Sequence, residues 1–304
     1  MTTIATVLFG YAAVLAAASP RFLSSQWLAR SPRLALALWH SCAVSVLLAS
    51  ILATVACYAD DGLLRGWLTA IDGSSGVPGI VAAAVAVLVP TVLIGRVTLT
   101  VWQVLARHRV ERDRHLKLVC LLGRHDHRLG VDVIPADVPA AYCVPGSKQI
   151  VLTKGAIAIL SDNELRAVLA HERAHLAGRH HLLVAWADAL QKAFPRVRLF
   201  NAMQQSTAHL VELLADDQTL RRASAESLAS AIAAMGCART PTIALAATGG
   251  SVLTRVERLL APPAPLPVAT RLGAAGAAIS LVALPILPIL ILTAGHIPCP
   301  HFFS

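Results

Sequence analysis

The chain has 304 residues, of which 56% are hydrophobic and only 14% are charged. Soluble domains carry about 25% charged residues, so this composition argues against an ordinary soluble enzyme, and against disorder, collagen or a coiled coil. An aqueous core could not hide this much apolar side chain without large exposed patches, which makes a lipid bilayer the natural solvent. The net charge of +9 comes from basic residues in short blocks beside apolar runs, as membrane topology requires. We therefore expect membrane lipid, and no direct nucleic acid, among the partners.

Four apolar segments, residues 3–19, 34–58, 77–106 and 271–295, predict membrane-spanning helices. Each approaches or exceeds the roughly 20 residues that cross the hydrocarbon core of a bilayer. The third segment contains Arg96 in its second half. That side chain either couples movements among the spans or snorkels toward the interface, and we favour snorkelling.

The distribution of charge in the loops predicts the orientation. The loop between the first two spans carries Arg21, Arg30 and Arg33 without an acidic residue, whereas the next loop is acidic. By the positive-inside rule, the first loop and the long polar region after the third span are cytoplasmic. The N-terminus and residues 296–304 then lie outside. The first segment lacks a basic start and a cleavage signal, so we expect a retained anchor.

The expected domains are three spans in residues 1–106, a polar domain in 107–267, the fourth span in 271–295 and the short external tail in 296–304. Within the polar domain, short β-like runs at 130–134 and 140–153 precede a region that is helical from Ser161 onward. Six scattered cysteines without a C-x-x-C pair favour a reduced compartment and argue against a cysteine-built metal site. The predicted fold class is an integral membrane protein, mainly α, with an inserted α+β domain.

A metal-binding motif stands on the first helix of that region. Ser161 and Glu164 match a capping box, and the helix that they open contains His171-Glu172-Arg-Ala-His175. Residues four apart share a helix face, so the two imidazoles can converge on one ion. Glu172 then lies beside the open coordination position, where it can take a proton from a water molecule. The pattern is H-E-x-x-H in the context that its chemistry requires.

A catalytic zinc site needs a third protein ligand, and the next helical segment supplies one. Glu212 and Asp216 share a helix face. Glu212 can therefore complete the metal shell while Asp216 orients one of the histidines through its free N–H. His180 and His181 follow the motif, and we expect them on the same helix, solvated or near its end rather than bound to the metal.

Taken together, residues 140–155, the run from Leu160 to His175 and the segment from Glu212 to Asp216 resemble the core of membrane-embedded gluzincin peptidases. The HtpX and CAAX-protease group and the BlaR/MecR antibiotic-sensor group share this core. HtpX-like proteins typically have two spans before the metal motif, whereas BlaR/MecR-like proteins place a cytoplasmic zinc domain between the third and fourth spans. The expected topology resembles the BlaR/MecR type, without its extracellular penicillin-binding sensor domain.

This resemblance implies a gluzincin-like zinc peptidase domain with one zinc ion. His171, His175 and Glu212 would be the metal ligands, Glu172 the catalytic residue and Asp216 an outer-shell partner. The reaction would be peptide-bond hydrolysis at a bacterial plasma membrane. The substrate would be a cytoplasmic protein, and BlaR/MecR relatives point to a winged-helix repressor of the BlaI type.

Two other functions stay open. An HtpX-like protease would remove damaged membrane proteins and would cut many substrates. A non-catalytic membrane receptor would use zinc structurally and would signal by conformational change. Structural zinc sites close all four positions with protein ligands, usually including cysteine, whereas three N/O ligands beside a glutamate favour catalysis.

Overall fold

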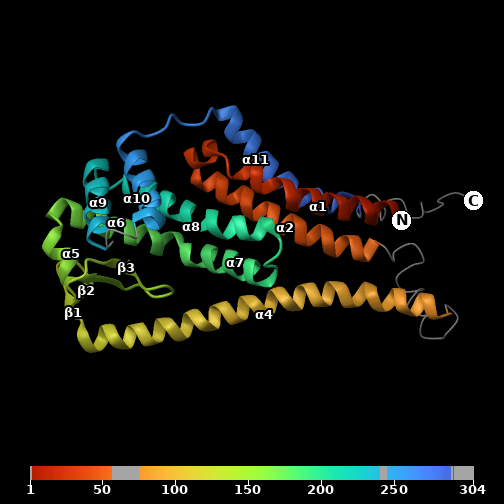
Figure 1. Cartoon of the computed structure of the whole chain (residues 1–304), viewed down its shortest axis with the longest axis horizontal. Coiled ribbons are helices and arrows are strands. Elements are labelled where there is room, and N and C mark those ends of the chain that lie inside the picture. Colours follow the sequence, from red (N-terminus) through yellow and green to blue (C-terminus); the bar gives the residue numbers. More distant parts are fainter. Residues whose placement is uncertain (1, 57–75, 240–244, 289, 291–304) are drawn as a thin grey trace, which may run out of the picture.

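The computed structural model describes residues 2–56, 76–239, 245–288 and 290 of the chain. The fold is mainly helical, with one small sheet at the end remote from the N-terminus (Figure 1). In chain order the elements are α1 (Thr2–Leu23), the 3-10 helix η1 (Gln26–Arg30), α2 (Pro32–Ala56), α4 (Gly76–Leu122), β1 (Arg124–Asp126), β2 (Val131–Ile134), β3 (Ala141–Cys143), β4 (Ile150–Thr153), α5 (Lys154–Ile159), α6 (Asp162–Gly178), α7 (His180–Ala193), α8 (Arg198–Thr219), α9 (Ala225–Arg239), α10 (Leu245–Leu260) and α11 (Val268–Ala283).

Among the described residues, three helices are long and apolar enough to cross a membrane, namely Thr3–Leu23, Pro32–Ala56 and Val87–Leu122. The first two match predicted spans, although residues 57 and 58 of the second lie outside the described residues, and the third overlaps the predicted span 77–106. The predicted fourth span at 271–295 overlaps α11, which has only 16 residues, and its residues 289 and 291–295 lie outside the described residues. A fourth span therefore stays a prediction.

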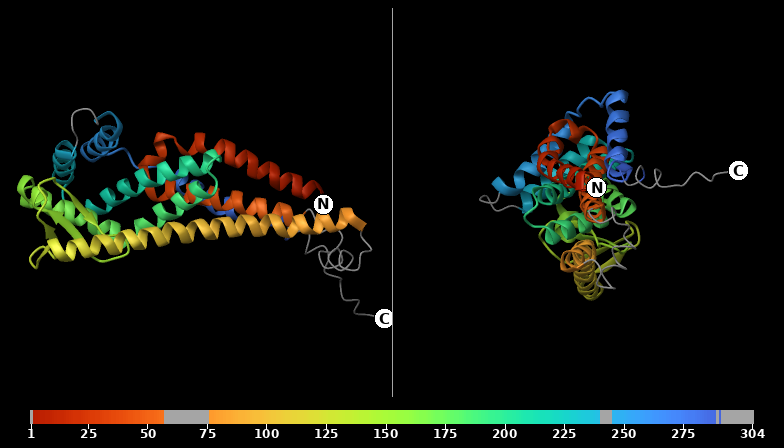
Figure 2. Two further views of the ribbon diagram at one scale, coloured as in Figure 1. Left: turned by 60° about the horizontal axis from the view of Figure 1, so that its bottom comes forward. Right: turned by 90° about the vertical axis from the view of Figure 1, so that its right-hand side faces the viewer.

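Helix α4 is longer than the predicted third span. It continues for 47 residues, through the boundary expected between 106 and 107, and ends only at Leu122. Between Arg96 and Leu122 the sequence contains no Gly or Pro, so nothing breaks the helix where the chain changes from apolar to charged. Figures 1 and 2 show α4 running along one side of the whole molecule, from the end of α2 to the sheet.

The sheet has the strand order β1-β2-β4-β3, with β2 and β4 parallel and the other pairs antiparallel. The strands β2, β3 and β4 fall within the predicted β-like runs. The strand β1 was not predicted, because its sequence Arg-His-Asp is wholly polar and it pairs only at the edge of the sheet. Residues 150–153 in β4 are buried throughout and pack on the apolar face of α6 through Leu165, Val168 and Leu169.

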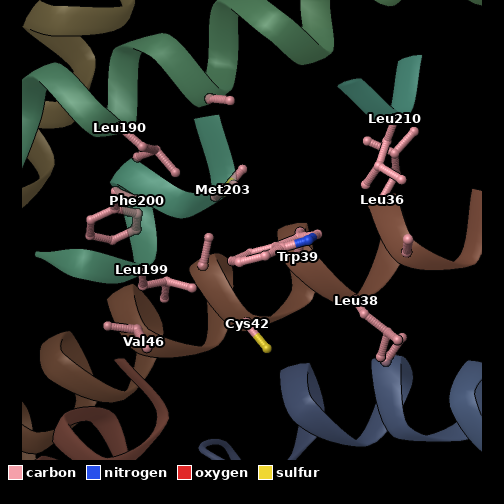
Figure 3. Packing of buried hydrophobic residues seen from close by; sticks show 14 of the residues in the cluster. Leu36, Leu38, Trp39, Cys42, Val46, Leu190, Leu199, Phe200, Met203 and Leu210 are labelled. Carbon is pink, nitrogen blue, oxygen red and sulfur yellow. The ribbon is translucent and has the colours of Figure 1, made fainter. Parts of the chain in front are cut away.

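The polar domain and the apolar helices share a core. The helices α7 and α8 form a hairpin that packs along α2, so that Leu190, Leu199, Phe200 and Met203 contact the cluster around Trp39 (Figure 3). Trp39 is completely buried there. The polar domain is therefore packed along the side of the apolar helix α2 through α8.

The packing around Phe200 predicts that removing its ring destabilises the protein. Phe200 is only 2% exposed, so Phe200→Ala should lower the free energy of unfolding of the full-length protein by about 3 kcal/mol through lost contacts and the cavity left behind. Thermal unfolding in detergent measures the change. The control Phe22→Ala removes the same ring from a site that is 72% exposed and should change the melting temperature much less; equal losses would contradict this account of the core.

Candidate metal centre

Helix α6 carries the H-E-x-x-H motif, and its start is fixed by the predicted capping box. The Ser161 hydroxyl accepts a hydrogen bond from the backbone N–H of Glu164, and the Glu164 carboxylate accepts one from the backbone N–H of Ser161. The carboxylate of Glu164 also accepts a bond from Ser230 of α9, at 2.5 Å. These contacts fix where α6 begins, and His171 and His175 of this helix lie close to Glu212 of α8.

The nitrogen and oxygen atoms of the predicted ligands lie close together. The Nε2 atoms of His171 and His175 are 3.0 Å apart, and the carboxylate oxygens of Glu212 lie 3.5 Å from the first and 3.4 Å from the second. Ligands at about 2.0–2.1 Å from a tetrahedral zinc ion stand about 3.3 Å apart. The three distances thus fit one such ion, and two imidazoles with one carboxylate form the donor set of a catalytic rather than a structural zinc site.

Each histidine turns its second ring nitrogen toward a buried partner. Nδ1 of His171 lies 3.0 Å from Oδ1 of Asp216, as the sequence predicts for an orienting carboxylate. Nδ1 of His175 lies 3.0 Å from Nδ1 of His180. Such partners fix the tautomer and the ring orientation of a metal-binding histidine.

The expectation that His180 follows on the same helix is wrong. Helix α6 ends at Gly178, Arg179 adopts a left-handed conformation with φ 47°, and His180 begins α7. The turn folds the His180 ring back over Gly178, where a Cβ atom would overlap it. His180 is therefore only 2% exposed and lies against the metal centre instead of in solvent.

Arg255 of α10 neutralises the acidic side of the centre. Its guanidinium donates to both oxygens of Asp216, at 2.8 and 2.7 Å, and lies 2.8 Å from Glu212. Three residues further on, Arg258 makes a similar pair with Asp217. No sequence motif indicates Arg255, because it is far from the acidic residues along the chain and only the packing of α10 brings it to them.

The electrostatics of the cluster keep its carboxylates ionised. Although burial alone would raise the pKa of Glu212, the contact with His171 and the charge of Arg255 lower it to about 2. Burial alone would also raise the pKa of Asp216, but the contacts with His171 and Arg255 lower it. Burial and the neighbouring charge of His171 lower the pKa of His175 to about 4. Burial alone would lower the pKa of His171, but its contacts with Asp216 and Glu212 raise it to about 9. Because a neutral imidazole and an ionised carboxylate are the forms that bind a metal, a metal ion at this centre would displace the proton of His171.

Glu172 lies between this cluster and the edge strand β3. Its Oε2 atom accepts a hydrogen bond of 2.8 Å from the backbone N–H of Cys143. Burial raises the pKa of Glu172. The backbone N–H of Val144 donates to the carbonyl oxygen of Gln149, next to β4. Because successive amides in a strand point to opposite sides, the N–H of Cys143 points away from the sheet. The free edge of β3 therefore faces Glu172.

Arg96 is bound to another helix, which supports the interpretation of this side chain as a link among the helices. Its guanidinium donates to the carbonyl oxygen of Ala193, at the C-terminal end of α7. A cation is favourable at this end of a helix, where carbonyl groups lack partners within the helix. Arg96 thereby ties α4 to the tip of the α7–α8 hairpin.

The contacts of Arg255 with Asp216 and Glu212 predict that removing its charge weakens metal binding. Arg255→Gln leaves Asp216 and Glu212 buried without their cation, so the affinity for zinc should fall about 10–100-fold, as measured by competition with a chelator. Arg258→Gln is the matched control, because it breaks a similar pair on the same helix whose carboxylate does not contact the histidines. An equal loss in both variants would contradict a specific role for Arg255.

Comparison with known proteins agrees with this geometry. The model of peptidase family M48 matches residues 107–261, which is more than half of the chain and contains every residue of the centre. No curated protein and no solved structure matches the chain. Family M48 consists of zinc metallopeptidases and includes proteins of the BlaR and HtpX types, so the match supports the broader resemblance seen in the sequence. The chain belongs to peptidase family M48.

Proposed function

We propose that this chain is an integral-membrane zinc endopeptidase that cleaves a cytoplasmic protein, in particular a winged-helix repressor of the BlaI type. The observation that carries the enzymatic part is the convergence of His171, His175 and Glu212 beside the carboxylate of Glu172. The long apolar helices support membrane insertion. The choice of a repressor rests on the resemblance of the expected topology to that of the BlaR/MecR type.

His171, His175 and Glu212 would hold the zinc ion, with Asp216 and His180 orienting the two rings. When bound, zinc supplies Lewis-acid polarisation of the scissile carbonyl group and lowers the pKa of a water molecule. All remaining steps belong to side chains and backbone groups of the chain.

Glu172 acts as the general base and later as the general acid. The pKa of Glu172 is raised toward neutral pH, and a group whose pKa is near the working pH transfers protons efficiently in both directions. The Cys143 amide holds Oε2, so Oε1 takes the proton from the attacking water and delivers it to the nitrogen of the leaving amine. Burial of this carboxylate also limits access of bulk water to the proton.

The edge strand β3 aligns the substrate. An extended peptide can add to a free strand edge through backbone hydrogen bonds, and the free edge of β3 faces Glu172. A peptide in this position passes the carboxylate in extended form. The site thus favours unfolded or flexible segments over compact folded ones.

The first test is Glu172→Gln in cells. New protein N-termini are compared between cells expressing the wild type and the variant, with and without a cell-wall antibiotic. We expect one Glu172-dependent cut in a small DNA-binding repressor. Many cuts in misfolded membrane proteins would instead assign the chain to quality control of the HtpX type.

The same variant separates catalysis from a receptor role. Glu172 is not one of the proposed ligands, so Glu172→Gln should retain about one zinc ion per chain while cleavage is lost. Zinc content is measured by elemental analysis of the purified full-length protein. Intact target transcription in cells with this zinc-loaded variant would sink the catalytic mechanism and favour the receptor.

A second prediction concerns His180. If His175 binds zinc through Nε2, its Nδ1 proton is donated to Nδ1 of His180. His180→Phe removes this acceptor and should weaken zinc binding about 10–100-fold, whereas His180→Asn keeps an acceptor and should recover part of the affinity. His181→Phe, one residue further on, is the control and should leave zinc affinity unchanged. Equal affinity in wild type and His180→Phe would remove His180 from the centre.

A further inference from the structure

A basic pocket lies on the side of α6 and α8 that is turned away from the metal centre. It consists of two adjoining hollows of roughly 150 and 210 Å³, which share Arg33, Gln218 and Arg221. We use the name basic pocket for the two hollows together. Their arginines come from the end of η1, the start of α2, the middle of α6 and the residues after α8, and are Arg30, Arg33, Arg173, Arg221 and Arg222.

These positive charges are poorly balanced within the protein. The one carboxylate that lines the hollows belongs to Asp217, and Arg258 already holds both of its oxygens, at 2.7 and 3.1 Å. Over the described residues, no carboxylate forms an ion pair with Arg30, Arg33, Arg221 or Arg222. These arginines are exposed, so water screens their mutual repulsion, and an anion between them would lower that repulsion further.

The pocket also lies at the start of an apolar helix. Helix α2 begins at Pro32, and Ser31 and Pro32 line one of the hollows. The first N–H groups of a helix lack partners within the helix and carry partial positive charge, which favours a phosphate. Because α1 ends and α2 begins beside η1 (Figure 1), the pocket is at the end of two membrane-type helices, within reach of lipid headgroups.

We propose that the basic pocket binds the phosphate of an anionic phospholipid headgroup, in the leaflet on the side of the peptidase domain. Guanidinium groups pair with phosphate through two parallel hydrogen bonds. A surplus of arginines also attracts anionic lipid over zwitterionic lipid. Gln218 adds an amide donor in both hollows.

A phosphate in this pocket joins the membrane helices to the metal centre. Arg33 belongs to α2, and Arg221 follows the end of α8. Arg173 directly follows Glu172 in α6 and also donates a hydrogen bond to the carbonyl oxygen of Leu129. One anion therefore links the start of a span to both helices that carry the candidate metal ligands. This inference does not depend on which peptide bond the centre cleaves.

The test measures lipid binding to the full-length protein in a nonionic detergent by native mass spectrometry. The probes are phosphatidylglycerol, phosphatidylcholine and inorganic phosphate. For the wild type we expect phosphatidylglycerol to bind at least tenfold more tightly than phosphatidylcholine. The double variant Arg33→Gln/Arg221→Gln should lose this preference, and Arg33→Lys/Arg221→Lys should keep part of it.

The matched control is Lys148→Gln/Lys154→Gln, which removes two positive charges from exposed positions of the same domain outside the pocket. It should bind phosphatidylglycerol as the wild type does. The proposal is overturned if the arginine variant keeps the full preference, or if the control loses as much as the arginine variant. A third outcome concerns inorganic phosphate. If it binds the wild type as tightly as phosphatidylglycerol does and binds the arginine variant tenfold more weakly, the pocket binds free phosphate, and the proposal of a lipid is overturned.

Discussion

The metal centre depends on holding two carboxylates and two imidazoles together in a nearly buried space. Glu212 and Asp216 would repel each other, and their desolvation would be costly, without a cation that touches both. Arg255 supplies that cation from a third helix. Because its planar guanidinium bonds both oxygens of Asp216, it fixes the carboxylate that in turn faces His171. Arg255 thus holds the acidic half of the centre together.

Helix α8 connects this centre to the apolar bundle. Its first half carries Leu199, Phe200 and Met203 into the cluster around Trp39, and its second half carries Glu212 and Asp216 to the histidines. A rigid helix transmits a shift at one end to the other. The hairpin partner α7 is tied in a comparable way, since His180 at its start touches His175 and Ala193 at its end accepts a bond from Arg96.

The sequence predicts the parts of the site that have a local pattern. Helical spacing brings His171 and His175 to one face, the capping box fixes where α6 begins, and the i, i+4 pair of Glu212 and Asp216 suits a ligand and its neighbour. These features depend on bonds and rotations within one or two turns, and the short strands β2, β3 and β4 follow from equally local alternation. The three long apolar helices follow in the same way from hydropathy alone.

The missed features are all set by tertiary packing. Arg255 has no spacing that relates it to α8, and the basic pocket takes its arginines from three separate segments. The break at Arg179 is hidden because a non-glycine residue adopts φ 47° there, a conformation that local propensity disfavours. The sequence also does not predict that the α7–α8 hairpin packs on α2. An amphipathic helix has the same sequence pattern whether its apolar face packs on a sheet or on a membrane-type helix.

The length of α4 sets the distance between its apolar start and the sheet that follows it. At a rise of 1.5 Å per residue its length is about 70 Å, more than twice the thickness of the hydrocarbon core. The stretch from Arg107 to Leu122, beyond the predicted span, accounts for about 24 Å of that length. Since β1 begins two residues after α4 ends, an α4 that crossed a bilayer over the predicted third span would hold the sheet at a set distance from the membrane. Under the proposed function, a polypeptide would then have to extend over that distance to reach the edge strand, so substrates would be selected by their reach as well as by their sequence.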